Sequence, residues 1–137
     1  MVGRIVGFFC RWCGYTAADL AAVARRPLPP ELVVVSVPCT GRVGPELVLD
    51  ALRGGAAGVI VVGCSRGDCH YVSGNLRAER RTRLLQPLLV QLGMGRRLRI
   101  ELISPSEVDR LVKVVWEMAE ELRLAERADR KEGEVVR

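Results

Sequence analysis

The sequence is poor in aromatic residues and has no long apolar run. Only 4% of its 137 residues are aromatic. No run approaches the roughly 20 apolar residues that a membrane helix needs. The six apolar residues that follow Arg4 are too short for the core of a signal peptide. We therefore expect a soluble, cytoplasmic protein with no membrane partner.

The motifs of common cofactor and catalytic sites are also missing. The chain contains neither G-x-G-x-x-G nor G-x-x-x-x-G-K-[ST], so a site for a dinucleotide or a nucleoside triphosphate has no support. No pair of carboxylates has a spacing typical of acid–base catalysis. We expect no catalysis by this chain alone.

The apolar residues that are present predict a single α/β domain. Hydrophobic residues make up 49% of the chain, enough for one core at this length. Four short, continuous runs rich in Val and Ile are typical of buried parallel strands. These runs cover residues 4–9, 32–37, 58–62 and 98–103.

Helical patterns lie between and after these runs. A Thr-x-x-Asp sequence predicts a helix over 16–25 that begins at Thr16. A second helix is predicted over 45–53, because Pro45 suits its first turn and two glycines follow its last residue. Residues 75–92 have leucines at helical spacing, with Pro87 predicting a kink or two shorter helices. A capping box at 104–107 opens the last helix.

The alternation of strands and helices predicts a small doubly wound fold. We expect a four-stranded parallel sheet in the flavodoxin-like order 2-1-3-4, with helices on both faces. Residues 1–125 form the single domain in this prediction. Residues 126–137 are mostly charged, and we expect this C-terminal tail to fray.

Five cysteines are the most informative residues of the chain. An odd number, without an export signal, argues against a disulfide framework. Each cysteine follows the end of a predicted strand, at the edge where parallel sheets bind ligands. Four thiolates suit either tetrahedral zinc or an iron–sulfur cluster. The five candidate ligands are Cys10, Cys13, Cys39, Cys64 and Cys69.

The neighbours of these cysteines allow more than one role. His70 either binds the metal or fixes its loop, and we favour the second role. Trp12 either shields the site and contacts a partner or packs over the strand end. Asp68 is assigned to the turn rather than to catalysis.

Arginines are concentrated in one part of the chain. Residues 74–99 contain seven arginines and one acid, Glu79. No aromatic residue lies among them, which argues against binding of nucleic acid. They form either a solvated helix face or a docking surface for an acidic partner, for which Arg77, Arg80, Arg81 and Arg83 are the candidates. A single asparagine and two glutamines are weakly indicative of a thermophilic source.

Four segments together resemble one known family. They are Cys10-Arg-Trp-Cys13-Gly-Tyr15, Val37-Pro-Cys39-Thr-Gly-Arg42, Gly63-Cys64-Ser-Arg-Gly-Asp-Cys69-His-Tyr71 and Gly74-Asn-Leu-Arg-Ala78-Glu-Arg80-Arg81. The sequence is similar, over about residues 5–120, to the delta subunit of methyl-viologen-reducing hydrogenase, an iron–sulfur electron-transfer protein.

The resemblance implies a cofactor, a role and partners. The cofactor is a 2Fe–2S cluster, which an aerobic preparation can lose. The chain would pass electrons from a hydrogenase or formate dehydrogenase to the flavin-containing subunit of heterodisulfide reductase. Cys10, Cys13, Cys64 and Cys69 would hold the cluster, and Cys39 is the fifth candidate, left out because no other cysteine is near it in the sequence.

The chain departs from the family at Ser65-Arg66, where the family often has His-Pro. This change adds a positive charge beside the expected cluster, which would raise its potential or alter the docking surface. Two other functions stay open on the residues alone. One is a structural zinc module, and the other is a thiol–disulfide protein that uses the C-x-x-C of Cys10 and Cys13.

Overall fold

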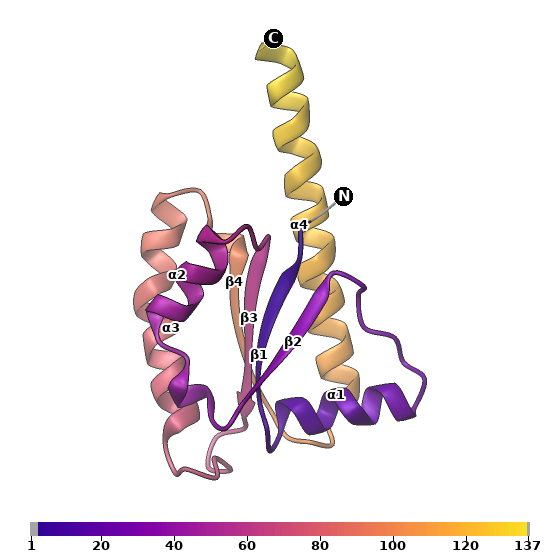
Figure 1. The fold of residues 1–137 in the computed structure, drawn as a ribbon, viewed down its shortest axis with the longest axis vertical. Coiled ribbons are helices and arrows are strands. Elements are labelled where there is room, and N and C mark those ends of the chain that lie inside the picture. Colours follow the sequence, from indigo (N-terminus) through magenta and orange to yellow (C-terminus); the bar gives the residue numbers. More distant parts are fainter. Residues whose placement is uncertain (1–2, 137) are drawn as a thin grey trace.

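The central feature of the structure is a four-stranded parallel sheet (Figure 1). The computed structural model describes residues 3–136, and the side chains of residues 3–128. The strands lie in the order β2-β1-β3-β4, which confirms the predicted fold class and strand order. Their bounds are β1 Ile5–Cys10, β2 Leu32–Val37, β3 Gly58–Cys64 and β4 Leu98–Ile103.

Helices cover both faces of this sheet, as predicted. Helices α2 (Pro45–Arg53) and α3 (Gly74–Gln91) pack on one face, and α1 (Gly14–Val23) and α4 (Val108–Val136) on the other (Figure 1). Short 3-10 turns, Thr40–Arg42 and Gly95–Arg97, precede α2 and β4. Two hydrophobic cores result, one on each face of the sheet.

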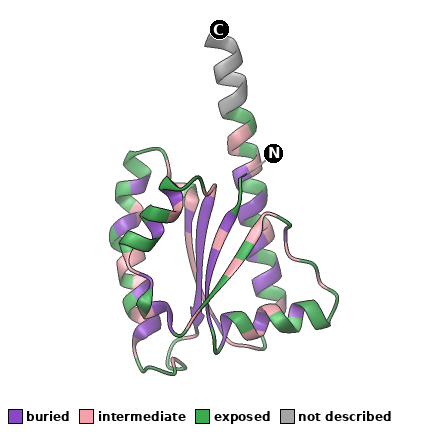
Figure 2. Cartoon of the chain, viewed as in Figure 1, coloured by how far each residue is buried: buried purple, intermediate pink, exposed green. Residues whose placement is uncertain are grey.

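The continuous apolar runs are explained by burial on both faces. All seven residues of β3 are buried, and five of the six in β1 are (Figure 2). The edge strand β2 is only half-buried. The parallel register pairs Cys10 with Val37 and Cys64 with Ile103, so the strands end at the same edge of the sheet. The loops at that edge contain the cysteines.

Two local predictions differ from the structure. Helix α1 begins at Gly14 rather than Thr16, so the predicted cap is wrong. Gly14 allows the earlier start, because a Cβ atom there would lie 2.8 Å from the carbonyl oxygen of Val62. Helix α3 is one helix with Pro87 inside it, so the alternative of two shorter helices is wrong.

The C-terminal helix is longer than the predicted domain. Helix α4 continues to Val136, past residue 125, where we expected a frayed tail to begin. The side chains beyond residue 128, and residue 137 itself, lie outside the described residues. The division of the chain at residue 125 therefore stays a prediction.

Candidate metal centre

The sheet topology brings all five cysteines to one edge. Cys10 and Cys64 are the last residues of the two central strands, and Cys13 precedes α1. Cys39 precedes the 3-10 turn after β2, and Cys69 lies in the loop between β3 and α3. Only the tertiary fold makes neighbours of residues as far apart as Cys10 and Cys64.

Three thiols form the inner part of the cluster. The sulfur atoms of Cys10, Cys13 and Cys64 lie within 4.8 Å of one another. The Sγ atoms of Cys10 and Cys64 are 3.5 Å apart. All three side chains are at most 5% exposed. The structure thus joins the C-x-x-C turn to the end of β3.

The other two thiols form a second pair beside the first three. The Sγ atoms of Cys39 and Cys69 are 3.8 Å apart, and Cys69 also packs against the inner thiols. Cys39 has no cysteine near it in the sequence, but it has one near it in space. The reason for leaving Cys39 out of the ligand set therefore does not hold in the folded chain.

Backbone N–H groups point at several of these sulfur atoms. Cys10 Sγ accepts hydrogen bonds from the N–H groups of Cys13, at 3.2 Å, and Gly14, at 3.4 Å. Cys39 Sγ accepts one from Gly41 at 3.4 Å. Such N–H groups stabilise a thiolate, and they tune the potential of a cluster that the thiolate binds.

Burial and hydrogen bonding act against each other on the thiol pKa values. Burial raises the pKa of Cys13 and Cys64 above the usual value, and also that of Cys39, although the Gly41 N–H partly opposes it. Burial would raise the pKa of Cys69 as well, but the N–H groups of Asn75 and Tyr71 hold it below the usual value. Most of the thiols are therefore neutral at pH 7, so a metal must displace their protons.

The start of α3 supports the second pair of cysteines. A Cβ atom at Gly74 would overlap Cys39 Sγ, so only glycine fits there. The next residue, Asn75, is 1% exposed, and its amide donates to the carbonyl oxygens of Cys64, at 2.9 Å, and Ser65, at 3.0 Å. These contacts fix the end of β3 against α3.

The aromatic residues and His70 lie on the outside of the centre. The rings of Trp12 and His70 stack with 4.1 Å between centroids, and Tyr71 meets His70 edge-on. The His70 side chain is exposed. Its stacking contact joins the C-x-x-C turn to the Cys69 loop.

Two polar residues of the Cys64–Cys69 loop have partners nearby. Asp68 accepts a hydrogen bond from the Ser65 hydroxyl at 3.0 Å, inside the turn to which we assigned it. The guanidinium of Arg66 lies 2.6 Å from Glu79. The positive charge that distinguishes this chain at Ser65-Arg66 is thus directed at a carboxylate of α3.

The four arginines proposed for docking have different surroundings. Arg81 is half-buried and donates to the carbonyl oxygen of Gly41, so it supports the Cys39 loop. Arg83 pairs with Glu79 at 3.3 Å. Arg80 is exposed, and Arg77 lines a pocket next to Cys39.

Sequence reasoning missed two residues of this region. Asn75 was not singled out, although it is the only asparagine of the chain and directly follows Gly74. Arg42 was quoted only as part of a motif, yet it lines the same pocket as Arg77. Its position three residues after Cys39, in Cys39-Thr-Gly-Arg42, was the available signal.

The fold and the site together define a class of protein, a small doubly wound α/β domain with a cluster of cysteine thiols at the ligand-binding edge of its sheet. Comparison with known families identifies the particular one. The family model described as "Methyl-viologen-reducing hydrogenase, delta subunit" matches residues 5–125. The chain belongs to this family, as the resemblance indicated.

Two kinds of relatives match the chain. It is 49% identical over 121 residues to the iron-sulfur subunit of the F420-non-reducing hydrogenase of Archaeoglobus profundus, covering 88% of each chain. It is 45% identical over 117 residues to the vhu iron-sulfur subunit of the F420-non-reducing hydrogenase of Methanopyrus kandleri, covering 85% of this chain and 89% of that one.

The second kind of relative is much longer. The chain is 40% identical over 119 residues to one of the subunits of the ferredoxin:CoB-CoM heterodisulfide reductase of Methanosarcina mazei. The match covers 86% of this chain but 15% of that longer one. A domain like this one thus occurs both by itself, in the hydrogenases, and as a small part of a reductase polypeptide. None of the helices in the described residues is long and apolar enough to span a membrane.

Proposed function

We propose that this chain is an electron-transfer subunit that carries a 2Fe–2S cluster. It would accept electrons from a hydrogenase or formate dehydrogenase and pass them to the flavin-containing subunit of heterodisulfide reductase. The observation that carries the proposal is the gathering of five cysteines, distant in sequence, at one edge of the sheet. The relatives are subunits of a hydrogenase and of a heterodisulfide reductase, which supports these two enzymes as partners.

The sulfur spacings fit the binding of two iron atoms. Two thiolates on one tetrahedral metal ion, each about 2.3 Å from it, lie about 3.8 Å apart. The Cys39–Cys69 distance is 3.8 Å, and the Cys10–Cys64 distance is 3.5 Å. We propose that Cys39 and Cys69 hold one iron and that two of the three inner thiols hold the other. The spare cysteine is then Cys10, Cys13 or Cys64 rather than Cys39.

The residues of this chain would bind, shield and tune the cluster. A bound 2Fe–2S cluster supplies one-electron transfer. The N–H groups of Cys13, Gly14 and Gly41 would neutralise part of the thiolate charge. The stacked rings of Trp12 and His70 join two of the ligand loops. No residue needs to transfer a proton or form a bond to substrate.

A structural zinc module is the second candidate. The three inner thiols, with Cys69 packed against them, would also suit one tetrahedral zinc ion. A thiol–disulfide enzyme is less well supported. The thiols of Cys10 and Cys13 are both buried, and a reactive thiol must be accessible to its substrate.

Metal analysis of protein purified without oxygen tests the proposal. We expect about two irons and two sulfides per chain, visible absorption, and an electron paramagnetic resonance signal after reduction. About one zinc per chain and no colour would instead identify the zinc module. A chain that takes up neither metal, even after reconstitution, would refute both candidates.

A further inference from the structure

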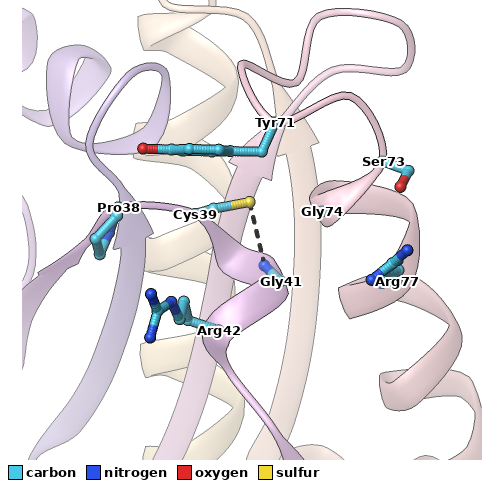
Figure 3. Close-up of a pocket in the computed structure, with 8 residues that line it drawn as sticks. All are labelled: Pro38, Cys39, Gly41, Arg42, Tyr71, Ser73, Gly74 and Arg77. Atoms are coloured by element: carbon cyan, nitrogen blue, oxygen red, sulfur yellow. Dashed lines mark hydrogen bonds between the residues drawn. The ribbon is translucent and has the colours of Figure 1, made fainter.

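A pocket of about 330 Å³ opens beside Cys39 (Figure 3). In Figure 3 the Cys39 side chain lies between the ring of Tyr71 and the side chains of Arg42 and Arg77. The two arginines come from different elements, the 3-10 turn Thr40–Arg42 and helix α3. The remaining lining residues are Pro38, Gly41, Ser73 and Gly74.

The pocket carries positive charge that no nearby carboxylate neutralises. Neither Arg42 nor Arg77 forms an ion pair with a carboxylate among residues 3–128. Glu79, the only acid of α3, is already paired with Arg66 and Arg83. No acidic residue lines the pocket. Two free guanidinium groups beside a buried sulfur atom favour the approach of an anion.

The pocket is also an open route to the cysteine cluster. The inner thiols are at most 5% exposed, whereas Cys39 is 9% exposed and forms part of a pocket wall. The exposed rings of Tyr71 and Trp12, residue types that are common at protein interfaces, lie on the same side of the cluster. Electron transfer between proteins is fastest where the two centres approach most closely.

We propose that this pocket is the electron port of the protein, where an acidic redox partner places a carboxylate against Arg42 and Arg77 and exchanges one electron through Cys39. The inference rests on the proposed function and adds the contact surface and the charge of the partner. Charge complementarity decides the chemistry of that partner, because the port is positive and lacks any acid of its own.

The first test measures the charge of the pocket without any metal. In the reduced apo-protein, the Cys39 thiolate displaces iodide from iodoacetate, an anion, and from iodoacetamide, which is neutral. The ratio of the two rates, followed at Cys39 by peptide mass mapping, cancels the effect of the thiol pKa. Replacing both arginines, as R42Q/R77Q, should lower the ratio about five-fold at low ionic strength, because the two positive charges that line the pocket with Cys39 no longer attract the anion.

The second test measures electron transfer from the loaded protein. The dithionite-reduced protein is mixed with cobalt(III)–EDTA, an anion, or with cobalt(III) tris(phenanthroline), a cation. In each reaction one electron leaves the reduced centre, and cobalt(III) becomes cobalt(II). R42Q/R77Q should slow the reaction with the anion about five-fold and should not slow the reaction with the cation.

A matched variant distinguishes an effect of the two pocket arginines from an effect of the net charge of the protein. R53Q/R96Q removes the same charge from exposed arginines at the end of α2 and before β4, which is the opposite edge of the sheet. We expect this variant to leave both the alkylation ratio and the rate of electron transfer to the anionic cobalt complex nearly unchanged.

Equal effects of the two double variants, or no effect of R42Q/R77Q, would overturn the port while leaving the proposed function intact. A wild-type chain that binds no iron would overturn the proposed function, and the port with it.

Discussion

Replacing Gly74 by alanine should separate the Cys39–Cys69 pair without unfolding the chain. The added methyl group would overlap Cys39 Sγ and lie 3.5 Å from Cys69 Sγ. Carbon and sulfur atoms that are not bonded keep about 3.5 Å apart, so Cys39 Sγ must move and the two sulfurs separate from 3.8 Å to about 4.6 Å. Two thiolates that far apart cannot both bind one iron with normal geometry.

The stability of the apo-protein should change much less than its metal content. Overpacking costs about 1–3 kcal/mol, and alanine gains up to about 1 kcal/mol over glycine in a helix. We therefore expect G74A to unfold within roughly 2 kcal/mol of wild type in urea. Its iron content after anaerobic reconstitution should fall from about two to less than about one per chain.

A second glycine at the start of a helix provides the control. Gly44 precedes α2, and a Cβ atom there meets only a carboxylate oxygen of Glu46, at 3.8 Å. G44A should load iron as wild type does. If G74A also loads about two irons with an unchanged spectrum, then Cys39 and Cys69 do not form the pair that holds one iron, and the ligand assignment is wrong.

Three further predictions concern single residues. Cys39→Ser should abolish iron loading, whereas at least one serine variant of the three inner cysteines should retain it; iron retained by Cys39→Ser would restore that residue as the spare one. Asn75→Ala should lower the free energy of unfolding of the apo-protein by about 2 kcal/mol in urea, because the buried carbonyl of Cys64 loses its donor; an unchanged urea midpoint would contradict this. Glu31 accepts hydrogen bonds from Arg123, which hold its pKa below the ordinary value of 4.5. The pair therefore stabilises the fold at neutral pH and ceases to do so as the pH falls through that lowered pKa, so the difference in Tm between wild type and Glu31→Gln should be present at pH 7 and disappear in acid.

Much of the fold followed from local patterns in the sequence. The bounds of β2, β4 and α2 agree with the predicted ranges, because short runs rich in aliphatic residues and an N-terminal proline act locally. The start of α1 did not follow. Its cap was predicted from Thr16, but the close approach of Gly14 to Val62 in β3, a tertiary contact, sets the actual start.

The sequence by itself determined the chemistry of this protein, and the tertiary structure decided how that chemistry is arranged. Five cysteines after strand ends, in a β-α-β order, already require thiols at one edge of a parallel sheet, since parallel strands end together. The sequence could not show that Cys39 faces Cys69, because 30 residues and a whole β-strand separate them. It also could not distinguish Arg81, which supports the Cys39 loop, from Arg77, which lines the open pocket. Neighbouring arginines of one helix look alike in sequence, and their different roles depend on the loops packed against each face of that helix.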